Sequence, residues 1–287
     1  MKHTDLITTP WNGYELIDSG DNRKLERIGG VLLDRPDPQA LWHKGKEGEW
    51  VSAQARFAWK QEGERWSFEQ GTPEKWSVSF GDIQLGLSFG QFKHIGIFPE
   101  HKAQWEKIKE VVQKNPGCRM LNLFGYTGGA SLVAAKAGAK VTHVDASKQT
   151  MQTVKENIAL SGLPADAVRM VVEDALKYAK RLVQREETFE IILLDPPAFG
   201  RGPKGEVWKI EEKLSELMET VAKLISSQAK LVILNGYAAG YSARSFGELC
   251  AEAFKDKGGD ISYGDVGIQE VGTERILPTG IYASWEN

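Results

Sequence analysis

Cysteine is scarce in this sequence, which has 2 among its 287 residues. Cys118 and Cys250 cannot build a disulfide framework, and neither belongs to a cluster with the spacing of metal ligands. A small disulfide-stabilised fold and a cysteine-ligated metal site are therefore excluded. We expect both residues to be reduced thiols in a cytoplasmic protein.

Long apolar runs are also missing, and histidine is sparse. No run approaches the roughly 20 apolar residues that cross a bilayer, and Met1–Leu6 lacks the apolar region of a signal peptide. No two histidines have the spacing of a metal site; the five are His3, His43, His94, His101 and His143. The sequence predicts a cytoplasmic protein without a membrane segment and without a bound metal.

The sequence also lacks a surplus of basic residues. Lysine and arginine number 36 against 39 aspartates and glutamates, a net charge of −3. General nucleic-acid clamps usually carry a basic surplus, so a nucleic-acid partner would need a local basic patch. The hydrophobic fraction of 41% and the charged fraction of 26% are ordinary for a globular protein.

Tryptophan, in contrast, is concentrated in the first part of the chain. Residues 1–91 contain six of the nine tryptophans, namely Trp11, Trp42, Trp50, Trp59, Trp66 and Trp76. Apolar and polar residues alternate in Ala55–Lys60 and Trp76–Phe80, with Gly63, Gly71 and Gly81 at hairpin spacing. We predict a small β-rich domain over 1–91. Its aromatic rings could stack on bases, but the favoured interpretation is that they form the domain's core.

The rest of the chain, 92–287, is organised around the stretch Met120–Gly129. An apolar run ends in Phe124-Gly125-Tyr126-Thr127-Gly128-Gly129, and a helix-forming segment follows. Glycine allows a positive φ and a close approach of a ligand, and the helix N-terminus offers unpaired N–H groups. The G-x-G-x-x-G spacing of dinucleotide sites is absent. An ordinary strand-to-helix turn is the alternative.

Strands and helices alternate after this turn, which predicts a parallel sheet with helices on both faces. We expect helices at 100–114, 130–137, 148–160, 175–187, 208–225 and 242–254, and strands at 120–123, 141–144, 168–172, 189–194, 231–234, 261–268 and 276–284. Ser147 is expected to cap one helix, and 200–205 to form a flexible loop. Polar residues follow several strands, at the end where ligands of such sheets bind: Asp145, Asp174 and Asp195.

Two motifs carry a resemblance to a known family. Asn122–Gly129, together with Asp195-Pro196-Pro197-Ala198-Phe199, resembles the class I S-adenosylmethionine-dependent methyltransferases. More narrowly, it resembles the bacterial large-subunit ribosomal RNA methyltransferases that modify cytosine C5 or guanine N7. The resemblance covers the chain from about residue 92 to its end. It implies a Rossmann-like, mostly parallel sheet with an antiparallel C-terminal strand, preceded here by the small β-rich domain.

The resemblance also implies a set of cofactor contacts for S-adenosylmethionine and its product S-adenosylhomocysteine. Asp145 would accept from the ribose hydroxyls and Asp174 from the adenine amino group. The alternative for Asp174 is a cap on the next helix, and both roles can hold at once. The full set is Phe98, Pro99, Phe124, Gly125, Tyr126, Thr127, Gly128, Gly129, Asp145, Ala146, Ser147, Asp174, Ala175 and Asp195.

The Asp195 corner is the expected acceptor site. Its two prolines end the strand ladder because proline lacks an N–H, and they leave carbonyls free to accept hydrogen bonds from a substrate amino group. Phe199 could stack on a planar substrate, or it could be a core residue of a rigid loop. The predicted catalytic residues are Asp195, Pro196, Pro197 and Phe199.

The sequence departs from the family in three places. Glu100-His101-Lys102 stands where Asp-Gln-Arg is common, Ala198 where lysine is common, and Ala238-Ala239-Gly240 where cytosine-modifying members have a nucleophilic cysteine. Neither Cys118 nor Cys250 is expected to reach the site, so we predict methylation of a nitrogen, with RNA as the favoured partner. The alternatives are a protein or small-molecule methyltransferase, a nucleotide-dependent oxidoreductase, and a non-catalytic nucleotide-binding protein.

Overall fold

The computed structural model describes residues 1–58, 65–237 and 240–287. Trp59, Lys60, Gly63, Ala238 and Ala239, which entered the predictions above, lie outside these ranges. The chain forms two compact units, each made of segments that are distant in sequence: unit 1 contains Met1–Leu6, Lys102–Val266 and Gly280–Asn287, and unit 2 contains Ile7–His101 and Gly267–Thr279. The domain boundary between residues 91 and 92 stays a prediction.

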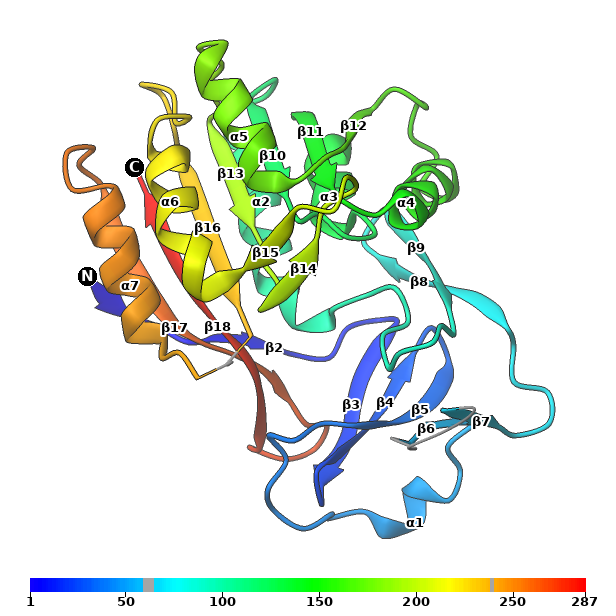
Figure 1. Ribbon diagram of the computed structural model, residues 1–287. Helices are drawn as coiled ribbons and strands as arrows, with labels where there is room; N and C mark the ends of the chain where they lie inside the picture. The colour runs from blue at the N-terminus through cyan, green and yellow to red at the C-terminus, as the bar shows by residue number, and fades with distance from the viewer. Residues whose placement is uncertain (59–64, 238–239) are drawn as a thin grey trace. The chain divides into compact units, whose positions relative to one another are not determined.

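Unit 1 is built on a sheet with the strand order β1-β17-β18-β16-β13-β10-β11-β12, and β2 pairs with β17 (Figure 1). The run from β16 to β12 is parallel, whereas β18 is antiparallel to β16. The strands are β1 (Lys2–His3), β2 (Leu6–Thr8), β10 (Arg119–Leu123), β11 (Lys140–Asp145), β12 (Val168–Val172), β13 (Ile191–Leu194), β16 (Leu231–Gly236), β17 (Asp260–Gln269) and β18 (Ile276–Glu286). The predicted Rossmann-like α/β class is confirmed.

The central strands are apolar because both faces of the sheet are covered. All four residues of β13 and all six of β16 are buried. In Figure 1, α5, α6 and α7 lie over one face, and α2 and α3 lie over the other. The helices are α2 (Lys102–Lys114), α3 (Gly129–Ala137), α4 (Lys148–Leu160), α5 (Ala175–Gln184), α6 (Ile210–Ala222) and α7 (Ala243–Ala253), and a short 3-10 helix, η1, covers Pro99–His101.

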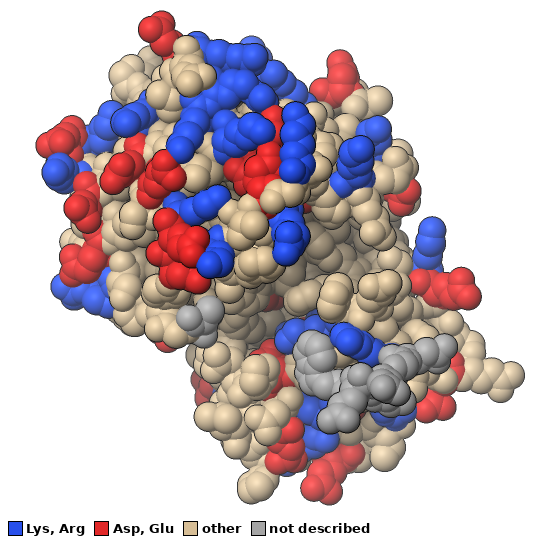
Figure 2. Space-filling view, viewed as in Figure 1, with Lys and Arg blue, Asp and Glu red and all other residues tan. Residues whose placement is uncertain are grey.

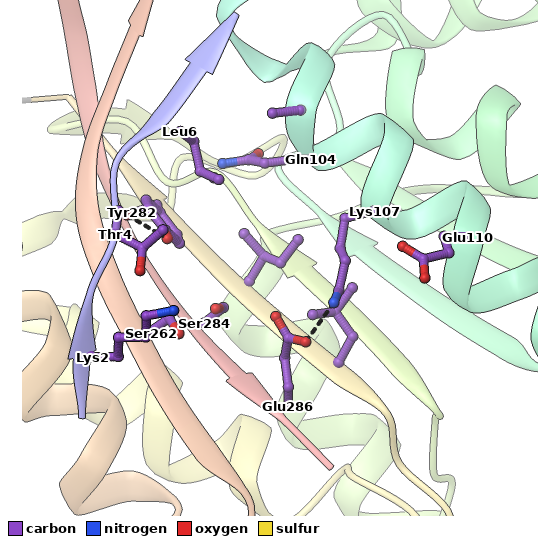
Figure 3. Close-up of a pocket in the computed structure, with 13 residues that line it drawn as sticks. Lys2, Thr4, Leu6, Gln104, Lys107, Glu110, Ser262, Tyr282, Ser284 and Glu286 are labelled. Atoms are coloured by element: carbon purple, nitrogen blue, oxygen red, sulfur yellow. Dashed lines mark hydrogen bonds and ion pairs between the residues drawn. The ribbon is translucent and has the colours of Figure 1, made fainter.

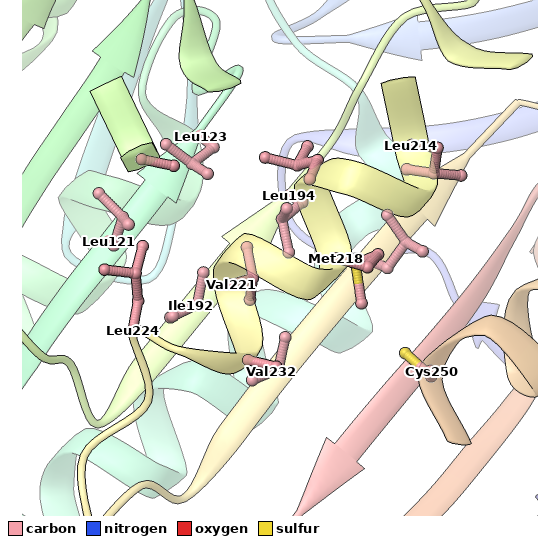
Figure 4. Packing of buried hydrophobic residues seen from close by; sticks show 14 of the residues in the cluster. Leu121, Leu123, Ile192, Leu194, Leu214, Met218, Val221, Leu224, Val232 and Cys250 are labelled. Atoms are coloured by element: carbon pink, nitrogen blue, oxygen red, sulfur yellow. The ribbon is translucent and has the colours of Figure 1, made fainter. Parts of the chain in front are cut away.

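The core under α6 shows how the sequence produces this packing. Leu214, Leu217, Met218 and Val221 recur at intervals of three and four residues, so they form one stripe along the helix. Figure 4 shows this stripe facing side chains of β10, β13 and β16, among them Leu121, Ile192 and Val232. Cys250 of α7 belongs to the same cluster and has no exposed surface.

Unit 2 contains the predicted β-rich part. One sheet has the order β3-β4-β5-β6-β7, and β8 and β9 form a separate antiparallel pair. The elements are β3 (Tyr14–Gly20), β4 (Arg23–Ile28), β5 (Val31–Pro36), α1 (Glu47–Trp50), β6 (Ala55–Phe57), β7 (Trp66–Phe68), β8 (Lys75–Phe80) and β9 (Ile83–Ser88). The turn between β3 and β4 has positive φ at Asp21 and Asn22, and Gly29 and Gly30 provide it between β4 and β5.

The described tryptophans of unit 2 have structural roles. Each donates its indole N–H within the unit: Trp11 to Ser79 O, Trp42 to Ser19 O, Trp50 to Asp18, Trp66 to Phe92 O and Trp76 to Ile28 O. Trp50 and Trp66 are buried, with exposed fractions of 6% and 7%. These contacts favour the core interpretation over a platform for base stacking.

Two local expectations were wrong, and one pairing was not predicted. Residues 200–205 do not form a simple loop, because β14 (Phe199–Arg201) pairs antiparallel with β15 (Val207–Lys209). The helix expected from residue 208 therefore begins at Ile210 and ends at Ala222. At the start of the chain, β1 and β2 pair with β17, a distant strand that no local pattern could have indicated.

Candidate functional site

Strand register brings the predicted polar residues to one edge of the unit 1 sheet. Leu123 of β10 pairs with Val144 of β11 on one side and with Leu194 of β13 on the other. The glycine turn, Asp145 and Asp195 come directly after these residues, so they emerge side by side. Asp145 pairs in turn with Val172 of β12, which places Asp174 near the same edge. This is the carboxyl edge, where α/β sheets bind ligands.

The backbone of the glycine turn is only partly as predicted. Positive φ angles occur at Phe124 (58°), Tyr126 (51°) and Gly128 (91°), but Gly125 and Gly129 do not have them. Gly128 precedes the first residue of α3, and the Gly125 N–H donates to Val144 O at 3.0 Å. Only Gly128 is therefore explained by a left-handed backbone conformation. Glycine at positions 125 and 129 has another cause.

Lack of space explains Gly125 and Gly129. A Cβ at Gly125 would lie 2.3 Å from Cε1 of His143, and one at Gly129 would lie 2.8 Å from Cζ2 of Trp105. Contacts this short require backbone or ring movement, which a close-packed interior resists. The two glycines let the turn pack directly on a strand and on α2.

His143 supports the turn from beneath, a role that its sequence context did not suggest. Its ring is fully buried, and Nδ1 lies 2.9 Å from Oγ of Ser131, which accepts a hydrogen bond from Nδ2 of Asn122. Burial lowers the pKa of His143 to about 4. The imidazole is therefore neutral near pH 7 and places no positive charge under the turn.

Asp145 is held by two backbone N–H groups at the end of β11. Tyr126 donates to Oδ2 at 3.0 Å and Ser147 donates to Oδ1 at 2.9 Å. Burial raises the pKa of Asp145 above its usual value, and these backbone bonds oppose that rise. Each carboxylate oxygen keeps a lone pair beyond the bond it already accepts, so the half-buried group can accept two further hydrogen bonds.

Two helix caps complete this side of the site. Ser147 accepts from Thr150 N at 3.1 Å and caps α4, as predicted. Asp174 is buried, and its Oδ1 accepts from Lys177 N at 2.9 Å, which makes it the N-cap of α5. The capping alternative for Asp174 is thus correct, and Oδ2 is not used in that bond. Ala146 is half-buried and Ala175 is buried beside them.

The Asp195 corner begins where β13 ends. Asp195 is half-buried, Pro196 is buried, and Phe199 is exposed over 56% of its surface. The prediction of free carbonyls is only partly correct, because Pro197 O accepts from Nε1 of Trp208 at 2.6 Å and Ala198 O accepts from Ile210 N at 3.0 Å. The exposure of Phe199 contradicts its interpretation as a core residue.

Comparisons with known proteins agree with this geometry. Residues 102–240 match the family model described as conserved hypothetical protein 95. A crystal structure of a SAM-dependent methyltransferase from Agrobacterium tumefaciens superposes with a TM-score of 0.95 and 38% sequence identity, covering 99% of this chain and 95% of that one. The chain belongs to the S-adenosylmethionine-dependent methyltransferases.

Curated relatives of this methyltransferase carry a more specific name. Ribosomal RNA large subunit methyltransferase K/L of Shewanella frigidimarina is 32% identical over 211 residues, and that of Cellvibrio japonicus is 31% identical over 169 residues. These alignments cover 73% and 58% of this chain. The methyltransferase spans only 28% and 22% of those two proteins, which are much longer.

Two predicted cofactor contacts of the methyltransferase, Phe98 and Pro99, belong to unit 2. Phe98 is half-buried and its ring lies 5.1 Å from that of His94, while Pro99 is buried at the start of η1. Glu100, where the family commonly has aspartate, is buried with 5% exposed, and its backbone carbonyl accepts from Oγ1 of Thr8 at 3.0 Å.

A cavity of about 380 Å³ in unit 1 contains none of the predicted site residues of the methyltransferase. Figure 3 shows it between α2 and the strands β1, β16, β17 and β18. Lys107 and Glu286 pair across it at 2.6 Å, and the Tyr282 hydroxyl donates to Thr4 O at 2.7 Å. Two other lining residues pair outside the cavity, Gln104 with Asn235 and Glu110 with Lys114. Because the cavity contains no residue of the glycine turn, the Asp145 end or the Asp195 corner, it is not part of the candidate site.

Residues 1–58, 65–237 and 240–287 bear on two further features, a metal site and a membrane-spanning helix. Among those residues, no three or more His, Cys, Asp or Glu side chains come together in a group that could hold a metal ion. No helix there is both long and apolar enough to cross a bilayer.

Proposed function

We propose that this methyltransferase transfers the methyl group of S-adenosylmethionine to a nitrogen of an RNA base, with ribosomal RNA as the favoured substrate. The observation that carries the proposal is the convergence of the glycine turn, Asp145 and the Asp195 corner at one sheet edge. The choice of RNA as the substrate is supported by the names of the curated relatives. A cytoplasmic location stays a prediction.

The residues at this edge fit the cofactor. The turn and the start of α3 offer backbone N–H groups to its methionine part. Asp145 has acceptor capacity for two ribose hydroxyls, and Asp174 Oδ2 with the Ala175 N–H suits the adenine edge. The proposed contacts at this edge are Phe124–Gly129, Asp145, Ala146, Ser147, Asp174, Ala175 and Asp195. Phe98 and Pro99, which belong to unit 2, stay predictions from the resemblance.

The acceptor would bind at the Asp195 corner. The bound cofactor supplies an electrophilic methyl group, so the protein's task is chiefly to position the nucleophile. The Asp195 carboxylate and the Pro196 carbonyl can accept hydrogen bonds from an amino group and thereby direct its lone pair. The carbonyls of Pro197 and Ala198 each accept one hydrogen bond already, and each keeps a second lone pair. The exposed Phe199 ring can stack on the base.

Removal of the Asp145 carboxylate should weaken cofactor binding. A hydrogen bond to a charged group contributes about 1.5–3 kcal/mol, so Asp145→Ala should raise the dissociation constant of S-adenosylhomocysteine roughly 10- to 150-fold. Titration calorimetry is the measurement, and the exposed Asp166 provides a matched control as Asp166→Ala. Equal affinity of Asp145→Ala and wild type would contradict the ribose assignment.

The positions of the two cysteines favour a nitrogen atom of the base, not cytosine C5, as the methyl acceptor. Methylation of cytosine C5 requires a thiolate to attack the ring first, because that carbon is a poor nucleophile. Cys250 lies in the core between α6 and α7, and burial raises its pKa to about 12. Cys118 is buried and precedes β10, at the opposite end from the turn. A nitrogen acceptor needs no such thiolate.

The double variant Cys118→Ser, Cys250→Ser should therefore retain methyl transfer. Because serine at position 250 would place a hydroxyl in an apolar core, Cys118→Ser, Cys250→Ala is the packing control. Thermal unfolding would establish that each variant is folded before the rate is measured. A folded double variant without activity, or a covalent adduct between protein and base, would make the nitrogen assignment wrong.

Radiolabelled S-adenosylmethionine tests the proposal as a whole. Wild type is incubated with fractionated RNA, protein and small molecules, and labelled RNA is digested to nucleosides to find the methylated atom. We expect label on a base nitrogen of RNA. Label in the protein or small-molecule fraction would identify those alternatives. Tight binding of S-adenosylhomocysteine without transfer to any fraction would indicate a non-catalytic binding protein.

A further inference from the structure

The ribbon of β14 and β15 begins at the Asp195 corner and has two different faces. Its register pairs Phe199 with Lys209, Gly200 with Trp208, and Arg201 with Val207. Paired residues of an antiparallel ribbon point to the same face, and successive residues point to opposite faces. Gly200 and Trp208 therefore share one face. The other, here called the outer face, carries Phe199, Arg201, Val207 and Lys209.

The inner face is fixed to the site. Trp208 is 2% exposed, its indole N–H donates to Pro197 O at 2.6 Å, and its ring centroid lies 4.9 Å from that of Phe124 in the glycine turn. Because a shift of register by one residue would expose this tryptophan, the anchor determines which side chains face outward.

The outer face combines exposed apolar and basic side chains. Phe199 is 56% exposed and Val207 is 37% exposed. The Arg201 guanidinium lies 6.0 Å from the Phe199 ring centroid and is open to solvent. Aromatic rings flanked by cations are the elements with which proteins hold single-stranded nucleic acid, through base stacking and phosphate contacts.

The charges around the ribbon show which cations are available. Figure 2 shows acidic and basic side chains intermixed over this part of unit 1. Lys177 pairs with Glu206 at 2.9 Å, and Lys209 pairs with Glu212 at 2.6 Å. The side-chain cations of Arg201 and Lys204, by contrast, form no ion pair with a carboxylate among the residues that the structure describes, and both residues are exposed. The Lys204 contact with Glu206 uses the backbone N–H, at 2.9 Å, and leaves the ammonium available. The two residues lie on β14 and in the turn that follows it.

We propose that the outer face of the β14–β15 ribbon, together with Lys204, is the docking surface for a single-stranded segment of the RNA substrate. Arg201 and Lys204 contact phosphates next to the target nucleotide, and Val207 packs against its neighbour. Phe199 stacks on an unpaired base at the corner. This surface supplies the local basic contact that the net charge of −3 does not. The inference rests on the proposed RNA methylation and identifies the form of RNA that the site accepts.

Fluorescence anisotropy with a labelled RNA of about 12 nucleotides measures the docking, since single-strand sites cover about 4–16 nucleotides. The double variant Arg201→Ala, Lys204→Ala should bind more weakly, and the slope of log K against log salt should fall by about 1.4, which is about 0.7 for each phosphate contact. Lys255→Ala, Lys257→Ala is the matched control, because both lysines are exposed beyond α7. It should bind like wild type.

Two further measurements separate stacking from charge. Phe199→Leu keeps an apolar side chain but should reduce affinity roughly 5- to 150-fold with little change in the salt slope, whereas Phe199→Trp should retain binding. A duplex RNA of the same length should bind more weakly than the single strand. Calorimetry with S-adenosylhomocysteine should give wild-type affinity for the Arg201 and Lys204 variant, which confirms that the fold is intact.

The outcomes distinguish this surface from the function on which it rests. If wild type methylates RNA but the Arg201 and Lys204 variant binds RNA with unchanged affinity and salt slope, the docking surface is wrong and the function stands. Preference for duplex RNA also overturns the surface as proposed. If wild type neither binds nor methylates RNA and instead labels a protein, both proposals are overturned.

Discussion

Asp195→Ala should lower the turnover number about 100-fold, the order of loss expected when a reacting group is misplaced by about 1 Å. Asp195 directly follows β13, next to the glycine turn in the sheet register, and precedes the exposed Phe199 by four residues. Its proposed hydrogen bond is to the reacting amino group, so its loss should affect the transition state more than the bound cofactor.

The experiment compares methyl-transfer kinetics with calorimetric affinity for S-adenosylhomocysteine. We expect that affinity to change less than about threefold, well under the effect of losing a charged hydrogen bond. Asp195→Asn keeps one acceptor oxygen and should be less impaired than the alanine variant, and Asp166→Ala again serves as the surface control. Asp195 also belongs to the predicted cofactor contacts, so a parallel loss of cofactor affinity and turnover would show that its chief role is cofactor binding or structural, not positioning of the acceptor.

Glu26→Gln should destabilise unit 2 by about 3–5 kcal/mol, the usual cost of breaking a buried ion pair by removing one partner. Glu26 has no exposed surface and lies among buried cations. Oε2 accepts from Arg35 at 2.6 Å, Lys24 lies 3.6 Å away, and the Tyr14 hydroxyl donates to Oε1 at 2.8 Å. Without this carboxylate, Arg35 would stay buried with its charge poorly compensated.

Glu26 should also make the free energy of unfolding depend on pH in the acid range. Burial by itself would raise the pKa of Glu26, but Arg35 and Lys24 outweigh it and lower the pKa to about 2 from an ordinary value of 4.5. Its contribution is therefore complete above about pH 4.5 and is lost as the pH falls toward 2. Glu26→Gln should lack this component of acid denaturation.

Denaturant unfolding followed by tryptophan fluorescence suits this test, because six of the nine tryptophans lie in the segment 7–101 of unit 2. Glu15→Gln is the matched control: Glu15 pairs with Arg27 at 3.5 Å, but both side chains are 42% exposed. Such a surface pair contributes at most about 1 kcal/mol. Equal destabilisation by the two variants would contradict the importance of the buried charge cluster.

Much of the fold could be predicted because its signals are local. The apolar runs of β13 and β16 indicate strands buried on both faces, and Leu214–Val221 of α6 shows the periodicity of a helix with one buried stripe. Ser147 and Asp174 act as caps on their own helices. These features depend on neighbours within a few residues, so the sequence alone determines them.

The parallel sheet was predicted from the alternation of strands and helices along the chain, not from any single residue. Alternating strands and helices favour parallel neighbours with right-handed crossovers, and polar residues after β10, β11 and β13 then meet at one edge. For this reason the sequence by itself determined which loops form the candidate site. It also identified the family through the turn Phe124–Gly129 and the Asp195 corner, a conclusion that the comparisons confirmed.

Only the tertiary structure decided the features that depend on residues distant in sequence. Gly125 is required by the ring of His143 on the neighbouring strand, not by its own backbone angle. The Pro197 carbonyl is occupied because Trp208 folds back onto it, which creates the β14–β15 ribbon and exposes Phe199. Likewise β1 and β2 join β17 from the far end of the chain. Packing contacts of this kind have no local signature, because steric fit and hydrogen-bond partners are settled only when distant segments meet.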